Sequence, residues 1–112
     1  MKSFANAIRG VGIILRTQPN IWVQILAGIV VVLMGIAYHI TNMEWIALTF
    51  AIGFVIVSEG FNSALEVDID LTSPEYHPFA RDTKDIAAGA VLLASLTATA
   101  VGLIIFVPKI LV

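Results

Sequence analysis

Three long apolar segments, separated by short polar ones, dominate this chain of 112 residues. They cover residues 21–40, 45–67 and 86–107, and each is close to the roughly 20 residues that a helix needs to cross a bilayer. Trp22 and Tyr38 lie near the two ends of the first segment, where aromatic side chains anchor a helix at the membrane surface. The pattern therefore predicts three transmembrane helices.

The first 18 residues follow a different pattern, with apolar residues at helical spacing and cations seven residues apart on another face. The apolar set is Phe4, Ile8, Val11 and Leu15, and the cations are Lys2, Arg9 and Arg16. This pattern predicts a helix over 1–18 that lies in the membrane interface with its apolar side down. An amphipathic helix on a soluble core is the alternative interpretation.

One polar residue interrupts the first apolar segment, and two prolines follow the second. Gln24 lies near the end of its segment, so we expect it to contact lipid headgroups rather than a neighbouring helix. Pro74 and Pro78 should end the second helix and form a structured loop before the third.

Composition supports a membrane protein and excludes several functions. The chain is 59% hydrophobic and 12% charged, which predicts an all-α integral membrane protein with a single domain over 1–112. The net charge is -2 and the sequence has no basic stripe that could neutralise phosphates, so nucleic acid is not expected as a partner. Cysteine is absent, which excludes disulfides and thiolate chemistry, and no phosphate-binding glycine loop is present.

The cations indicate the orientation of the chain. With three spans, all but one lie on one side: Lys2, Arg9, Arg16, Arg81 and Lys84, with Lys109 opposite. The positive-inside rule then places the N-terminus and residues 58–85 in the cytoplasm, where ATP is available.

A polar stripe at the end of the second span is the strongest candidate for chemistry. On a helix, one face would carry Glu59, Asn62, Ser63, Glu66 and Asp70. The loop could bring Lys84 and Asp85 back to this face. Carboxylates and an amide suit Mg²⁺ together with substrate phosphates, and lysine suits a transferring phosphoryl group. The alternative is the solvated end of a helix leaving the bilayer, but apolar residues flank Glu59 on both sides.

The motif EGFNSALEVDID, followed by SPEYHPFARDTKDIAAGAVLL and preceded by FANAIRG, resembles the small prokaryotic diacylglycerol kinase and undecaprenol kinase family. The resemblance implies a homotrimer with sites between protomers, each protomer having a surface helix and three transmembrane helices. It also implies transfer of the γ-phosphate of Mg-ATP to a membrane lipid at the cytoplasmic face of the inner membrane.

The resemblance assigns roles by position. Glu59 would be the general base, Asn62 would support the phosphoryl group, Glu66 would bind Mg²⁺ and Lys84 would contact the phosphates. The nucleotide site would also include Asp70, Glu75, Tyr76, His77 and Asp85, and the lipid would approach Asn6, Arg9 and Gly10. Where the family commonly has a second metal-binding glutamate, this chain has Gln18, a weaker Mg²⁺ ligand.

The acceptor lipid and two other functions stay open at this point. The segments SPEYHP and GLIIFVPKI resemble the undecaprenol kinase branch, so we favour undecaprenol as the acceptor, with diacylglycerol second. The alternatives are a catalytically degenerate relative and a small oligomeric channel with a carboxylate-lined vestibule.

Overall fold

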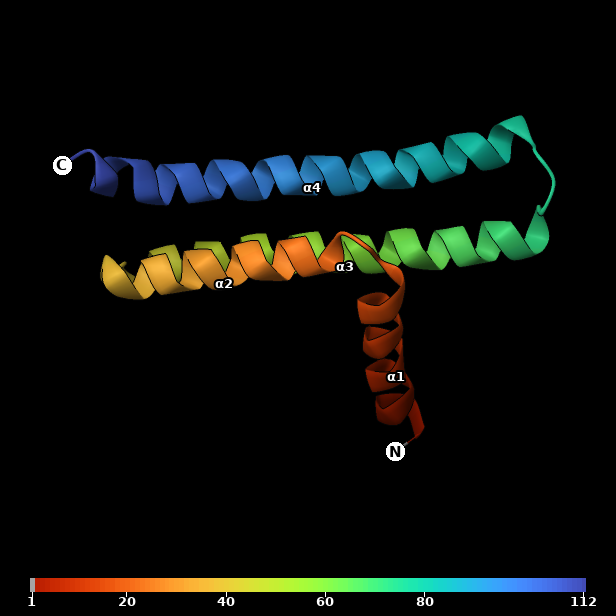
Figure 1. Ribbon diagram of the computed structural model, residues 1–112, viewed down its shortest axis with the longest axis horizontal. Coiled ribbons are helices and arrows are strands. Elements are labelled where there is room, and N and C mark those ends of the chain that lie inside the picture. The colour runs from red at the N-terminus through yellow and green to blue at the C-terminus, as the bar shows by residue number, and fades with distance from the viewer. Residues whose placement is uncertain (1) are drawn as a thin grey trace.

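The computed structural model describes residues 2–112 and contains four helices, with no strand among these residues (Figure 1). They are α1 (Lys2–Thr17), α2 (Ile21–Ala37), α3 (Asn42–Thr72) and α4 (Pro78–Ile110). Helices α3 and α4 run side by side in opposite directions, and the chain bends by 101° between α1 and α2. The all-α prediction is confirmed.

Two helices, α3 and α4, are long and apolar enough to cross a membrane, and the bent pair α1 and α2 together passes the same test. At 1.5 Å per residue, the 31 residues of α3 extend about 47 Å, well beyond a hydrocarbon core of about 30 Å. Helix α3 is therefore longer than the hydrocarbon core is thick, and most of its charged residues lie in its C-terminal half.

Helix α2 ends at Ala37, three residues before the end expected for the first apolar segment. The N–H of Ile40 donates to the carbonyl of Gly35, and the N–H of His39 donates to that of Ile36. His39 adopts a left-handed φ of 52°. These are the bonds of a Schellman motif, which ends a helix by satisfying its last carbonyls.

The connections on either side of α3 follow local sequence signals. Thr41 and Glu44 form a capping box at the start of the helix. The helix ends at Thr72, just before Pro74, and α4 begins with Pro78 at its first position. The expectation that the two prolines end one helix and shape the loop before the next is confirmed.

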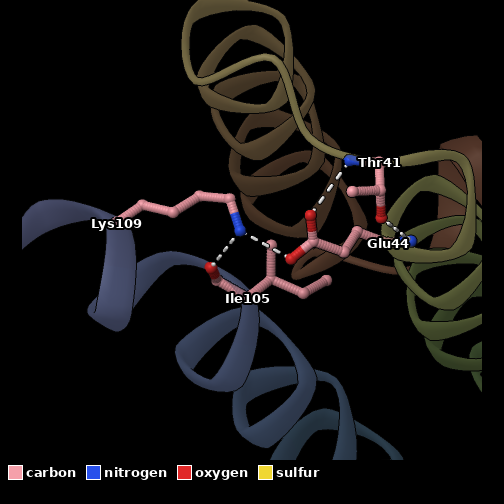
Figure 2. Close-up of polar contacts among 4 residues, drawn as sticks. All are labelled: Thr41, Glu44, Ile105 and Lys109. Atoms are coloured by element: carbon pink, nitrogen blue, oxygen red, sulfur yellow. Dashed lines mark hydrogen bonds and ion pairs between the residues drawn. The ribbon is translucent and has the colours of Figure 1, made fainter.

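An ion pair joins α3 to α4 at the end opposite the 73–77 loop (Figure 2). Lys109 Nζ donates to Glu44 Oε2 at 2.6 Å and to the carbonyl of Ile105 at 3.1 Å. The hydrogen bond from Lys109 holds the pKa of Glu44 below its usual value. A buried apolar cluster of Ile40, Leu48, Ile105 and Phe106 packs nearby. Together these contacts fix the two long helices relative to one another.

Helix α1 packs on the rest of the chain only near its C-terminal half. The space above Gly60 is filled by the side chain of Ile14, whose Cδ1 lies 3.1 Å from where a Cβ would be. Trp22 Nε1 donates to the carbonyl of Leu15 across the bend. Phe4, Ile8 and Val11 stay exposed, as a helix on a membrane surface requires.

Candidate active site

The polar stripe on α3 is largely buried. Glu59, Asn62 and Ser63 are only 4%, 7% and 6% exposed, while Glu66 is half-buried and Asp70 is exposed. Burying a charged or amide side chain is costly unless it is paired, so such groups usually serve a purpose. A solvated helix end would leave these three side chains exposed, and this alternative is therefore wrong for Glu59.

Glu59 is held by a residue from α2. Gln24 Nε2 donates to Glu59 Oε1 at 2.8 Å, and no other hydrogen bond reaches this carboxylate from residues 2–112. The expectation that Gln24 contacts headgroups is wrong: the chain fold places its amide against α3 instead. Periodicity within one helix could not reveal this contact, because the two residues lie 35 positions apart.

The neighbouring polar side chains form two further pairs. Asn62 Nδ2 donates to Glu66 Oε1 at 3.2 Å, and Gln18 Nε2 donates to the Ser63 hydroxyl. The carbonyl oxygen of Asn62 is buried and has no hydrogen-bond partner among residues 2–112. A buried acceptor without a protein partner is unfavourable and is available to a ligand.

A cavity of about 400 Å³ brings most of these residues together. Its lining comes from the α1–α2 connection, the α3 stripe and α4: Thr17, Gln18, Pro19, Asn20, Glu59, Asn62, Glu66, Ala88 and Val91. Glu59, Asn62 and Glu66 of the stripe therefore share one cavity with Gln18, whereas Ser63 and Asp70 of the stripe do not line it.

The oxygen atoms in this cavity fit Mg²⁺ only together with a phosphate ligand. Within residues 2–112, no group of three or more His, Cys, Asp or Glu side chains could hold a metal alone. Mg²⁺ usually binds through one or two carboxylates plus substrate phosphates, and Glu66, with the unpaired carbonyl of Asn62, matches that need.

Lys84 lies beside Asp70, at the C-terminal end of the stripe, as expected, but Asp85 does not. Lys84 Nζ donates to Asp70 Oδ1 at 2.6 Å across the α3–α4 hairpin. This hydrogen bond raises the pKa of Lys84, so its ammonium stays charged at neutral pH. Asp85 is exposed and lies 3.8 Å from Arg81 of its own helix.

The remaining candidate residues lie outside this cavity. Glu75, Tyr76 and His77 are exposed in the loop before α4. His77 caps that helix, accepting the N–H of Phe79 at its Nδ1, and its ring lies 5.5 Å from the Phe79 ring. On α1, Asn6 and Arg9 are exposed and Gly10 is half-buried.

A second cavity, of about 440 Å³, lies between α2, α3 and α4 and is almost entirely apolar. Its wall runs along α2 from Gln24 to Met34, along α3 from Leu48 to Ile56, and along α4 from Ser95 to Ile110. By the rise of a helix, the α4 wall is about 22 Å long. The cavity follows the apolar part of the bundle and reaches Gln24, whose amide contacts Glu59.

Comparisons with known proteins agree with these features. The family model described as prokaryotic diacylglycerol kinase matches residues 5–106. The undecaprenol kinase of Bacillus subtilis is 35% identical over 108 residues, covering 96% of this chain and 88% of the relative. A diacylglycerol kinase of Synechocystis is 36% identical over 110 residues, covering 97% of this chain and 63% of the relative. No solved structure matches the chain.

The matched region includes α2, α3 and most of α4, together with every residue of the polar cavity. The apolar helices agree with a membrane-bound family. This chain belongs to the prokaryotic diacylglycerol kinase family, a family of membrane lipid kinases.

Proposed function

We propose that the protein transfers the γ-phosphate of Mg-ATP to the hydroxyl of a membrane lipid. The observation that carries this proposal is the polar cavity, where buried Glu59 lies with Asn62 and Glu66 at the border of the apolar bundle. Phosphoryl transfer asks mainly for positioning and charge stabilisation, and this set of side chains can supply both.

Glu59 is the proposed general base. Its Oε1 accepts the amide N–H of Gln24, which leaves Oε2 without a hydrogen bond from residues 2–112. The lipid hydroxyl gives its proton to this oxygen as its own oxygen bonds to the γ-phosphorus. The bond between that phosphorus and the bridging oxygen of ADP breaks, and ADP leaves.

Glu66 and Asn62 would hold the metal that accompanies ATP. Mg²⁺ would neutralise charge on the phosphates and so favour attack by the lipid oxygen. Asn62 keeps the Glu66 carboxylate in place through its own amide N–H. Gln18 supplies a neutral amide to the same cavity, so we expect a higher Mg²⁺ requirement than a glutamate would give.

Lys84 is the proposed phosphate contact. Its ammonium is paired with exposed Asp70 in this structure, and the phosphates would compete for it as a point charge. Loop residues Glu75, Tyr76 and His77, with Asp85, are proposed to complete the nucleotide site. Residues 75–77 lie in the loop before α4 and Asp85 lies near the start of that helix, so all four are at the same end of the α3–α4 hairpin as Lys84 (Figure 1).

The acceptor is proposed to be undecaprenol rather than diacylglycerol. The Bacillus subtilis relative, named undecaprenol kinase, aligns over 88% of its own length, against 63% for the Synechocystis diacylglycerol kinase. The long apolar cavity next to Gln24 can take part of a lipid chain of either kind. Asn6, Arg9 and Gly10 lie on α1, where a lipid would approach along the membrane surface.

We also propose a homotrimer whose active sites face the cytoplasm. Ala87 and Ala94 are buried, while Gly89 has no neighbouring heavy atom within 4 Å of the position that a Cβ would take. This open position on α4, outside the apolar cavity, could receive a helix of another protomer. If this is right, the largest product of chemical crosslinking in detergent would be a trimer. A largest product of another size would contradict the trimer.

A competition assay tests the acceptor. Purified protein in mixed micelles would receive γ-labelled ATP and equal amounts of undecaprenol and diacylglycerol, and the labelled lipids would be separated by chromatography. We expect label mainly in undecaprenyl phosphate. Label mainly in phosphatidic acid would contradict the proposed acceptor but keep the kinase, whereas no labelled lipid from folded protein would contradict both.

A further inference from the structure

Gln24 lies where the two cavities meet. Its side chain forms part of the wall of the apolar cavity, and its amide nitrogen contacts Glu59, which lines the polar cavity. Apart from the indole N–H of Trp22, its amide is the only polar side-chain group in Ile21–Ala37. A helix in this position gains nothing in stability from an amide unless the amide has a partner.

The hydrogen bonds of Gln24 are satisfied on one side only. Nε2 donates to Glu59, but the carbonyl Oε1 is buried and accepts no hydrogen bond from residues 2–112. Leaving a buried acceptor unpaired costs free energy. The N–H donor to Glu59 is the feature of Gln24 that can offset this cost. An apolar residue of the same size would fill the apolar wall without the cost.

The polar side chains of α3 nearest to Glu59 donate elsewhere. Ser58, next to Glu59, donates its hydroxyl to the carbonyls of Phe54 and Val55 in its own helix. Asn62 donates to Glu66. Among residues 2–112, Gln24 is therefore the one residue whose side chain donates a hydrogen bond to the Glu59 carboxylate.

We infer that Gln24 is the positioning residue of Glu59: it holds Oε1 and leaves the other carboxylate oxygen for a lipid hydroxyl arriving from the apolar cavity. This inference rests on the proposed function, in which Glu59 takes the hydroxyl proton. Gln24 acts through Glu59 and takes no part in bond making. Its loss should lower the rate of transfer, because misplacing a reacting group by about 1 Å can cost on the order of 100-fold.

Two variants test the inference. Gln24→Met keeps the length of the side chain and fits an apolar wall but has no donor, and Gln24→Asn keeps the amide on a shorter side chain that does not reach α3. Thr49→Val is the matched control: it removes one hydroxyl bond, to the carbonyl of Trp45, from an exposed position outside both cavities. All three would be compared with wild type for kcat and for KM of lipid and ATP.

We expect both Gln24 variants to lose roughly 10- to 100-fold in kcat with little change in either KM, and the control to match wild type. Infrared spectra add a readout that packing alone would not move. The carboxylate band that disappears in Glu59→Gln should shift in Gln24→Met and stay in place in Thr49→Val.

Four results would overturn the inference. A folded Gln24 variant with the kcat of wild type, or an unshifted carboxylate band in Gln24→Met, would show that Glu59 is oriented without Gln24. A raised KM for lipid at unchanged kcat would make Gln24 a lipid contact instead. A folded wild type that phosphorylates no lipid would overturn the proposed function, and the positioning role with it.

Discussion

Replacing Glu59 by glutamine removes the proposed base and little else. The side chain is 4% exposed, so a larger change would disturb the packing of α3. Glutamine has almost the same shape, and its carbonyl oxygen can still accept the N–H of Gln24 that Glu59 Oε1 accepts at 2.8 Å. The fold should therefore survive with its hydrogen bond to α2 intact.

The rate of phosphoryl transfer, in contrast, should fall. General base catalysis typically contributes 10²- to 10⁴-fold, or about 2.7–5.4 kcal/mol of activation free energy at about 1.36 kcal/mol per tenfold. We therefore expect Glu59→Gln to lower kcat by roughly 10²- to 10⁴-fold. The KM for ATP should change little, because the proposed nucleotide contacts are other residues.

The assay is transfer of labelled γ-phosphate to lipid in mixed micelles, with thermal unfolding measured in the same detergent. Asp68→Asn is the matched control, since it makes the same chemical change at an exposed position of α3 outside the cavity. A Glu59→Gln protein that unfolds like wild type and keeps more than a tenth of its kcat would refute the role of Glu59 as base.

Three further predictions concern charge and packing. Lys84→Met should raise the KM for ATP roughly 10-fold or more, measured by steady-state kinetics, because a charged contact to phosphate is lost. Lys109→Met should lower the Tm at pH 7 and flatten its fall in acid, measured by thermal unfolding across pH. The hydrogen bond from Lys109 lowers the pKa of Glu44, so the pair stabilises the fold at neutral pH and this stability is lost as pH falls through that lowered pKa. Gly35→Ala should lower the Tm, because its Cβ would lie 2.7 Å from the Trp45 ring. This overpacking costs about 1–3 kcal/mol, and the helix propensity of alanine offsets about 1 kcal/mol of it.

Each of these predictions has a control and a contrary result. Lys2→Met is the control for Lys84→Met, because it removes a cation far from the proposed nucleotide site. If Lys2→Met raised the KM for ATP as much as Lys84→Met does, the effect would come from net charge and not from a phosphate contact. A Lys109→Met protein with the acid profile of wild type would contradict the Glu44 pair. Gly12→Ala, where no heavy atom lies within 4 Å of the new Cβ, should raise the Tm; a rise for Gly35→Ala as well would show that the Trp45 ring moves away freely.

Much of the fold followed from local signals in the sequence. Apolar segments long enough to span predicted the helices, and Pro74 and Pro78 located the break between α3 and α4. The spacing from Glu59 to Glu66 predicted a shared face because helical geometry fixes which side chains are neighbours. The sequence also contains a capping box, with Thr41 and Glu44 three residues apart. This motif marks the start of α3 at Asn42.

The contacts between helices could not be predicted in the same way. Gln24 meets Glu59 across 35 residues and Lys109 meets Glu44 across 65, and neither pair has a local spacing rule. Polar residues near the ends of apolar segments can reach headgroups or another helix, and only the packing of α2 on α3 decides between them. The position of Asp85 could not be predicted either, because the helical turn of α4 places its side chain near Arg81 and not near the stripe.

The central claim is that this chain moves phosphate from ATP to lipid rather than to water. The most direct measurement compares the two products in one reaction with γ-labelled ATP, counting lipid-bound label against ADP formed. We predict one labelled lipid phosphate per ADP when a lipid alcohol is present, and almost no ADP when it is absent. ADP formed with inorganic phosphate as the labelled product, or no ADP at all from folded protein with lipid and Mg²⁺ present, would contradict the account.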